Sequence, residues 1–182
     1  MQRHLGDLLD SKVGGDVTFE VGGELFMAHR YVLAVRSSVF MAELFGSSMK
    51  EKLSNRVRID DMEARVFKIL LRFIYMDSLP EDIDADEKTV VAQHLLVAAD
   101  RYNLQRLKLV CEDMLGTSVD VRTAATTLVL AEQHACQWLK DACFGFLRSP
   151  GKLKAVMATE GFQHLKNSCP ALLEELLAMV AP

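Results

Sequence analysis

The sequence predicts an α+β fold, with a small β-sheet flanked by helices and followed by an all-helical second half. Three observations predict it. Apolar and polar residues alternate over 17–21, which is typical of a half-buried strand. Apolar residues recur at spacings of three and four over 66–74, which is typical of a helix. Every long segment from Thr89 onward has helical periodicity as well.

All the strands are expected in the N-terminal part of the chain. A short amphipathic segment, with leucines at helical spacing, precedes Gly14. Two strands follow over 17–21 and 24–28, and the Gly22-Gly23 pair between them supplies the positive φ angles of a tight hairpin turn. Ser37 is the expected cap of a short helix. Two short helices and one further short strand are predicted over 31–35, 37–45 and 57–59.

The next helix is predicted to lie in the centre of the core. Asp60 and Glu63 have the spacing of a capping box, which predicts the start of this helix. Apolar residues surround all of it except a narrow stripe formed by Arg65, Lys68 and Arg72. Further helices are predicted over about 89–101, 104–115, 121–135 and 137–147, with shorter helices from there to residue 181.

Composition argues against several classes of partner. The 182 residues include 21 basic and 25 acidic side chains, a net charge of −4, so nucleic acid is not an expected partner. No apolar stretch approaches the roughly 20 residues of a membrane-spanning helix, so a membrane is not expected either. The four cysteines have no C-x-x-C spacing, which favours reduced, mostly buried thiols in an intracellular protein of the nucleus or cytoplasm.

The sequence offers no catalytic or metal-binding constellation, so we expect neither an enzyme nor a cofactor. The five histidines are scattered and none lies in a nucleophile motif. His134 and Cys136 are two residues apart in or near a helical stretch, which places them on different faces and makes a shared metal unfavourable. Asp82, Asp84 and Asp86 resemble a calcium loop only superficially, because the glycine and the glutamate that such a loop needs are missing.

The remaining candidates for function are apolar side chains in polar surroundings. Met49 is one, and two interpretations of it stay open. Either Ser48 and Glu51 form a capping box with Met49 folded inward, or Met49 anchors the groove of a partner with Glu51 as its polar neighbour. Leu5 and Leu8 pose a similar choice, because they can cover their own core or form half of an apolar dimer seam.

Residues 16–45 resemble the opening of a BTB/POZ domain. The most specific motifs there are a D-V-x-F-x-V strand, an F-x-A-H-R turn and a V-L-A-x-R-S-x-V-F run. Residues 95–115 are similar to the closing BTB helices, and residues from about Val119 resemble the BACK, or 3-box, extension. The closest resemblance is to the plant-like branch of the MATH-BTB (speckle-type POZ) proteins. It implies a BTB/POZ domain over 1–115 and a BACK-like helical extension over 116–182.

The same resemblance implies a non-enzymatic, dimeric adaptor that binds a cullin-3-type scaffold in a ubiquitin ligase complex. The hydrophobic-x-Glu motif for cullin contact maps onto Met49, Lys50 and Glu51. BTB domains of the family form two-fold homodimers or heterodimers with other BTB proteins. The matching interface positions are Leu5, Leu8, Asp16, Arg30 and Val32. Only about 15 residues precede the BTB motifs, which implies a chain without the MATH domain, either an excised fragment or a natural short form. The alternative function is a dimerisation module that recruits transcriptional regulators without a ligase role.

Overall fold

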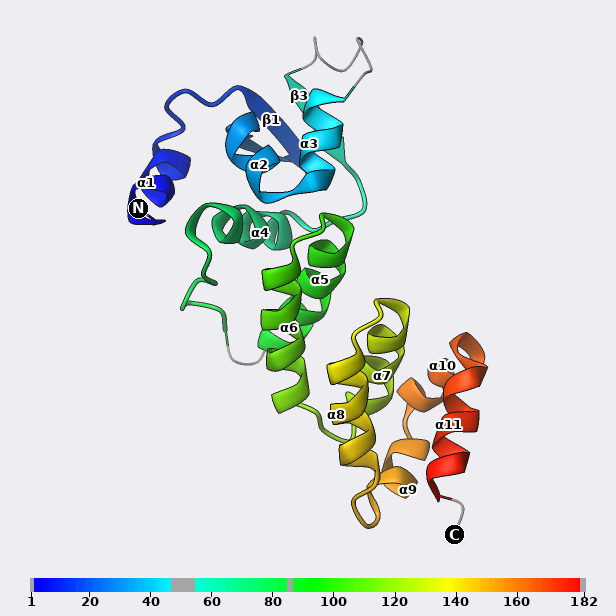
Figure 1. Cartoon of the computed structure of the whole chain (residues 1–182). Helices are drawn as coiled ribbons and strands as arrows, with labels where there is room; N and C mark the ends of the chain where they lie inside the picture. Colours follow the sequence, from blue (N-terminus) through cyan, green and yellow to red (C-terminus); the bar gives the residue numbers. More distant parts are fainter. Residues whose placement is uncertain (1, 47–54, 85–86, 181–182) are drawn as a thin grey trace. The chain divides into compact units, whose positions relative to one another are not determined.

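The computed structural model describes residues 2–46, 55–84 and 87–180, and the chain divides into two compact units, Met1–Lys108 and Leu109–Pro182 (Figure 1). The first unit contains α1 (Gln2–Ser11), β1 (Val17–Val21), β2 (Glu24–Ala28), α2 (Arg30–Arg36), α3 (Ser38–Phe45), β3 (Arg56–Ile59), α4 (Ala64–Met76) and α5 (Lys88–Arg101). Helix α6 (Gln105–Thr117) carries the chain from the first unit into the second. The second unit continues with α7 (Ala124–Gln133), α8 (Gln137–Leu147), α9 (Lys152–Met157), α10 (Glu160–Ser168) and α11 (Pro170–Val180). The predicted α+β fold is confirmed.

The sheet has the strand order β2-β1-β3, so β1 is central and β2 and β3 are its edges. β1 pairs with β2 in an antiparallel register and with β3 in a parallel one. The predicted alternation in β1 is confirmed, because Val17, Phe19 and Val21 are buried while the residues between them are only half-buried. Gly22 and Gly23 have φ angles of 56° and 83°, the left-handed backbone that the hairpin turn requires.

Helix α4 is the centre of the first unit, as its nearly all-round apolar sequence predicts. Its buried residues are Val66, Phe67, Ile69, Leu70, Leu71, Phe73, Ile74 and Tyr75. The ring of Phe67 lies 5.1 Å from that of Phe19 on β1, and Phe19 in turn meets Phe40 of α3 edge to face at 5.6 Å. Phe40 stacks on Tyr102, with ring centroids 4.4 Å apart. These aromatic contacts join the sheet, α3, α4 and the end of α5 into one core.

One predicted cap is confirmed and the other is wrong. Ser37 caps α3, because its hydroxyl accepts a hydrogen bond from the Phe40 N–H at 3.1 Å. The capping box expected from Asp60 and Glu63 does not form. Glu63 itself is the N-cap residue of α4 and its side chain makes no capping hydrogen bond. The Asp60 carboxylate instead accepts a hydrogen bond from Arg58 at 2.6 Å.

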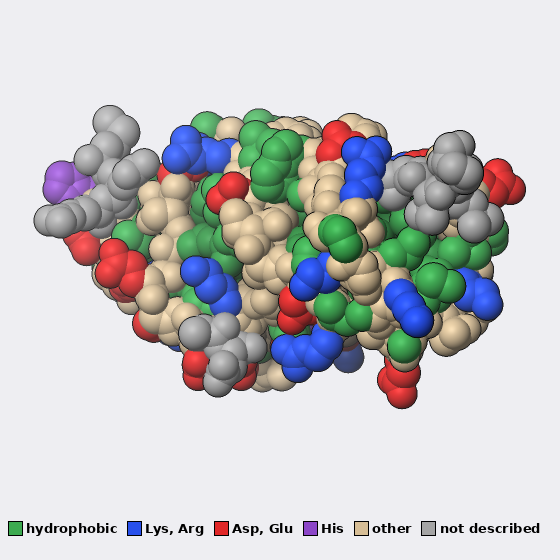
Figure 2. All heavy atoms as spheres, turned by 90° about the horizontal axis from the view of Figure 1, so that it is seen from below, with side chains coloured by type: hydrophobic (Ala, Val, Ile, Leu, Met, Phe, Trp, Pro, Cys, Tyr) green, Lys and Arg blue, Asp and Glu red, His purple; other side chains and the backbone are tan. Residues whose placement is uncertain are grey.

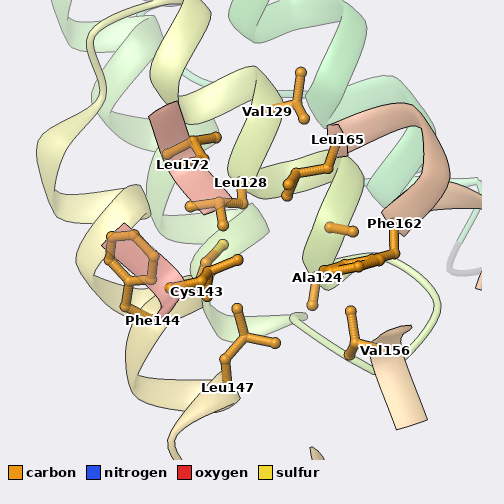
Figure 3. Packing of buried hydrophobic residues seen from close by; sticks show 12 residues of the cluster. Ala124, Leu128, Val129, Cys143, Phe144, Leu147, Val156, Phe162, Leu165 and Leu172 are labelled. Atoms are coloured by element: carbon orange, nitrogen blue, oxygen red, sulfur yellow. The ribbon is translucent and has the colours of Figure 1, made fainter. Parts of the chain in front are cut away.

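The second unit has its own core (Figure 3). Buried residues come from α7, α8, α9, α10 and α11. Leu128 of α7, Cys143 of α8 and Leu165 of α10 are at most 1% exposed there. A partly exposed ion bridge ties the helices together, since Lys140 donates to Glu132 at 2.7 Å and to Glu175 at 2.9 Å. The four thiols are free: Cys111, Cys136 and Cys143 are buried and Cys169 is half-buried, as predicted.

The chain's one tryptophan, Trp138, lies within the second unit against the glycine of α6. A methyl group on Gly116 would lie only 2.5 Å from Cζ3 of the indole ring. The close approach of α6 and α8 at this point therefore depends on the absence of a side chain at Gly116. The indole is nevertheless 52% exposed, so its outer face is open to solvent.

Candidate functional site

A groove of about 510 Å³ lies in the first unit, between the β3–α4 connection and α5. It is lined by Asp60, Asp61, Met62, Glu63, Val66, His94, Val97, Ala98 and Arg101. The lining mixes apolar and ionisable side chains, with three carboxylates on the β3–α4 side and His94 and Arg101 on the α5 side. Five of the nine lining residues are ionisable, so the groove offers a partner both polar contacts and a limited apolar surface.

The groove exists because α5 buries only one face. Leu95, Leu96 and Ala99 point into the core, whereas His94, Val97 and Arg101 follow one another at spacings of three and four on the uncovered side. Val97 is 40% exposed, so its apolar surface is available to a partner. Burial of the remaining exposed part of this side chain on binding stabilises a complex by roughly 0.6–1.2 kcal/mol.

An ion pair fixes the two walls of the groove relative to each other. Arg101 donates to the Asp61 carboxylate at 2.6 Å, across 40 residues of sequence. This hydrogen bond holds the pKa of Asp61 below its usual value and raises the pKa of Arg101. At the other end, the Glu63 carboxylate lies 3.7 Å from His94 Nδ1. The Arg101–Asp61 ion pair therefore connects the two walls directly, and His94 and Glu63 also lie close together across the groove.

Helix α3 lies beside the groove. Ser38, its first residue, accepts a hydrogen bond from the Asn103 side chain at 2.8 Å, just beyond the end of α5. Glu43 acts electrostatically on Arg101 and raises its pKa. Met41 is 47% exposed on the same helix. Helix α3 thus brings Glu43 near the groove-lining Arg101, and it ends at Phe45, shortly before residues 47–54.

The three predicted cullin-contact residues, Met49, Lys50 and Glu51, lie outside the described residues. Their assignment therefore stays a prediction, and so do both interpretations of Met49. The groove beside α3 is a feature that the sequence reasoning missed. The sequence could have indicated this groove, because His94 and Arg101 interrupt the apolar pattern of α5 at helical spacing and so mark a face that the core does not cover.

The first two predicted dimer residues, Leu5 and Leu8, are both half-buried on α1. Helix α1 packs against α4 of its own chain. A methyl group on Gly6 would lie 3.0 Å from the sulfur of Met76, which shows how closely the two helices approach. Part of the apolar surface of α1 is therefore used within the chain, and the rest is available to another molecule.

On α2, the third predicted dimer residue, Val32, is half-buried. Its neighbours are far more open: Tyr31 is 73% exposed and Val35 is 80% exposed. These two residues are four apart and so lie one above the other on the helix. Val13, in the α1–β1 connection of the same unit, is 69% exposed. The first unit therefore presents large apolar side chains that it does not cover itself.

Asp16 and Arg30, the charged pair predicted for the dimer interface, contact each other within the chain. The Arg30 backbone N–H donates to Asp16 Oδ1 at 2.7 Å, and Arg30 Nε donates to the Asp16 carbonyl at 3.2 Å. Arg30 Nη2 also donates to the Asn55 side chain at 3.2 Å. A carboxylate at the first turn of α2 stabilises that helix end. The pair therefore has an internal role that joins β1, α2 and the start of β3.

A histidine in the F-x-A-H-R motif holds the α1–β1 connection in place. His29 Nε2 lies 2.8 Å from the Val13 carbonyl, and its Nδ1 lies 2.9 Å from the Tyr75 hydroxyl. Because a carbonyl can only accept, Nε2 carries the proton and Nδ1 accepts from Tyr75. The His29 backbone N–H donates to the same hydroxyl at 2.8 Å. Burial raises the pKa of Tyr75 to about 12, so this phenol keeps its proton at neutral pH.

The described residues were compared with the requirements of a metal site and of a reactive thiol. Across residues 2–46, 55–84 and 87–180, no three His, Cys, Asp or Glu side chains come together as a metal site. Burial raises the pKa of the Cys111 and Cys143 thiols to about 12, which leaves them protonated at neutral pH. On the face drawn in Figure 2, basic and acidic side chains are interspersed among hydrophobic ones. No helix within those same residues is long and apolar enough to cross a bilayer.

Comparison with known proteins identifies the class. The family model for the BTB/POZ domain matches residues 5–119, and the model for the BACK domain of BPM/SPOP proteins matches residues 123–177. The chain belongs to the BTB/POZ domain family. A helical BACK region follows the BTB domain, as the sequence resemblance predicted.

Three relatives from Arabidopsis thaliana illustrate the relationship. The chain is 50% identical over 187 residues to BTB/POZ and MATH domain-containing protein 3, with 100% of this chain and 46% of that protein covered. It is 40% identical to protein 4 over 188 residues and 40% identical to protein 5 over 191 residues, covering 98% of the chain each time. The aligned parts are 40% of protein 4 and 45% of protein 5. The chain therefore spans less than half the length of these relatives.

Proposed function

We propose that this chain is a non-enzymatic, dimeric adaptor that binds the N-terminal domain of a cullin-3-type scaffold, as part of a ligase that ubiquitinates substrates. Within this proposal the BTB domain comprises residues 1–115, the BACK-like extension comprises residues 116–182, and the protein acts in the nucleus or cytoplasm. The observation that supports it best is the open groove between the β3–α4 connection and α5, with the exposed side chain of Val97, in a member of the BTB/POZ family.

In this proposal the cullin contact has two parts. Met49 enters an apolar pocket of the cullin and Glu51 fixes its orientation, with Lys50 between them. A second segment of the cullin lies in the groove against Val97 and Met62. Helix α3 supports the idea that one partner covers both parts, because its Glu43 acts on the groove-lining Arg101, its Met41 is exposed, and it ends shortly before residues 47–54.

The experiment measures binding of a purified cullin-3-type N-terminal domain by isothermal titration calorimetry. A Met49→Ala/Glu51→Ala double variant and a Val97→Glu variant should each weaken binding by about tenfold or more, since an interface anchor is worth about 2 kcal/mol. Val90→Glu is the matched control, because Val90 is 52% exposed on the same helix and does not line the groove. Wild-type affinity in the double variant would reject the assignment of Met49 and Glu51.

The dimer is proposed to be two-fold, so that one apolar surface serves both subunits. Leu5, Leu8 and Val32 contribute its apolar part, together with the exposed side chains of Tyr31 and Val35. Asp16 and Arg30 contribute indirectly, because their internal hydrogen bonds hold the start of α2 in position. The same surface would serve a homodimer or a heterodimer with another BTB protein.

Light scattering after size-exclusion chromatography tests the dimer. A Tyr31→Asp/Val35→Asp variant should elute as a monomer, because each carboxylate would face apolar surface of the second subunit. Val90→Asp is the matched control and should leave the dimer intact. An unchanged dimer in the double variant would show that α2 lies outside the interface. A stable dimer that binds no cullin would favour the module that recruits transcriptional regulators.

A further inference from the structure

The outer edge of β2 borders a hollow that the proposed cullin and dimer contacts leave unused. β2 is an edge strand, and no other strand within the described residues pairs with its outer side. A hollow of about 240 Å³ lies between this strand, the end of α1 and the exposed side of α4. It is lined by Leu9, Asp10, Lys12, Glu24, Leu25, Phe26, Met27, Lys68, Leu71 and Arg72.

The hollow combines apolar side chains with an open strand. Leu25 is 56% exposed and Met27 is 38% exposed, and they are two residues apart on β2. Residues two apart on a strand lie on the same face, so these side chains form a short apolar ridge along the strand. An open strand edge binds a peptide through its backbone groups, and side chains along the edge select the sequence.

The net charge of the residues that line the hollow is opposite in sign to the net charge of the whole chain. Lys12, Lys68 and Arg72 line it against only two carboxylates, although the chain has a net charge of −4. Arg72 is engaged only loosely, since its Nη1 lies 3.7 Å from Asp10 Oδ1 and its Nη2 donates to the Met76 sulfur at 3.5 Å. Lys68 has no ion-pair partner within the described residues. The basic centre of the hollow is therefore available to an external acidic group.

A second hollow of about 350 Å³ continues this surface along α4, and it shares Lys68 and Arg72 with the first. Its far wall carries Glu81 and Asp82. Arg65, at the same end, is already paired with a carboxylate of this chain, that of Glu87. The basic part open to a partner is therefore short, and it is centred on Lys68 and Arg72 beside β2.

We propose that the outer edge of β2 binds an extended, acidic segment of a partner protein as an added strand. The backbone of that segment pairs with the edge of β2, and its carboxylates face Lys68 and Arg72. An apolar side chain of the segment packs on the exposed ridge of Leu25 and Met27. The five residues of β2 allow a paired stretch of roughly 17 Å.

This docking surface is independent of the proposed cullin contact. None of the residues that line the hollow beside β2 lines the groove beside α5. Loss of cullin binding and loss of peptide binding can therefore be separated by variants. Val97→Glu should leave peptide binding unchanged, and Lys68→Glu should leave cullin binding unchanged.

The test uses the whole chain and two end-capped synthetic peptides, one alternating valine with glutamate and the other alternating valine with lysine. Amide hydrogen exchange reads out which backbone groups each peptide protects. We expect the acidic peptide to protect amides of β2 and the basic peptide to protect none. Lys68→Glu should weaken binding of the acidic peptide about fivefold, because it replaces an exposed attraction with a repulsion. Lys88→Glu is the matched control, since Lys88 is an exposed lysine outside both hollows.

Several results would overturn this proposal. They are equal binding of both peptides, protection away from β2, no binding of the acidic peptide, or an unchanged affinity in Lys68→Glu. The peptide-free protein is measured at two concentrations to identify other occupants. Protection of the outer edge of β2 that grows with concentration would assign it to a second copy of the chain. Protection that is independent of concentration would assign it to the chain itself. Either result would also reject the acidic partner.

Discussion

Replacing Ser37 with alanine removes a buried hydroxyl that joins α3 to the end of α5. The Ser37 hydroxyl accepts from the Phe40 N–H at 3.1 Å and donates to the Tyr102 carbonyl at 2.6 Å, and the residue is 1% exposed. Loss of an N-cap costs about 1 kcal/mol. A buried carbonyl that loses its donor costs about 1–2 kcal/mol more. We therefore expect Ser37→Ala to lower the free energy of unfolding by about 2–3 kcal/mol.

Urea denaturation of the whole chain, followed by circular dichroism, measures this loss, and amide exchange at Phe40 reports it locally. Ser38→Ala is the matched control one residue away. The Ser38 hydroxyl accepts its hydrogen bond from Asn103 at an exposed position, so its removal should cost at most about 0.5 kcal/mol. Because α3 flanks the groove, Ser37→Ala should also weaken cullin binding while Ser38→Ala retains it.

If the Ser37→Ala and Ser38→Ala variants are equally stable, the Ser37 hydroxyl does not stabilise the protein in the way described. Equal stability would mean that water or another group replaces the Ser37 hydroxyl at both of its partners, and that the buried connection between α3 and α5 does not depend on it. A large loss in Ser38→Ala would contradict the reasoning in a different way, because it would place the important contact at the surface.

The remaining predictions concern the second unit. Gly116→Ala should displace the ring of Trp138 and shift the single-tryptophan fluorescence to longer wavelength. Gly145→Ala, which meets nothing within 4 Å, should leave the emission unchanged. Lys140→Met should lower the free energy of unfolding by only about 0.5–1 kcal/mol, measured by thermal denaturation, because two partly exposed glutamates lose a shared cation. Burial raises the pKa of Cys143 from 9.0 to about 12, so the unfolded thiol releases its proton first. The contribution of Cys143 to stability should therefore be constant below pH 9 and be lost between pH 9 and pH 12, so a Cys143→Ala variant should lose less stability than the wild type over that range in urea titrations.

Local sequence patterns were sufficient to predict much of the fold. The alternation in β1, the hairpin at Gly22 and the cap at Ser37 each depend on residues within a few positions of one another. The same kind of reasoning was wrong at Asp60, where the spacing fitted a capping box. There the competing interaction was also local, because Arg58 holds the carboxylate. Motif spacing therefore failed where two nearby groups compete for one side chain.

Resemblance extended the prediction to domain type, and the match to the BTB/POZ and BACK models confirmed it. It also assigned Met49, Lys50 and Glu51 to cullin contact, which remains a prediction because these residues lie outside the described part of the chain. For Asp16 and Arg30 the structure added an internal role that the motif does not express.

The sequence by itself determined the class of fold, the order of its elements and the face of each helix that is apolar, because these properties depend on periodicity along the chain. Only the tertiary structure decided which apolar residues remain uncovered and which polar groups meet. Tyr31 and Val32 are adjacent apolar residues on one helix, yet the first is exposed and the second is half-buried. Arg101 finds Asp61 across 40 residues of sequence. The physical reason is that exposure and pairing depend on which elements pack together, and this is set by the whole core rather than by neighbours in the sequence.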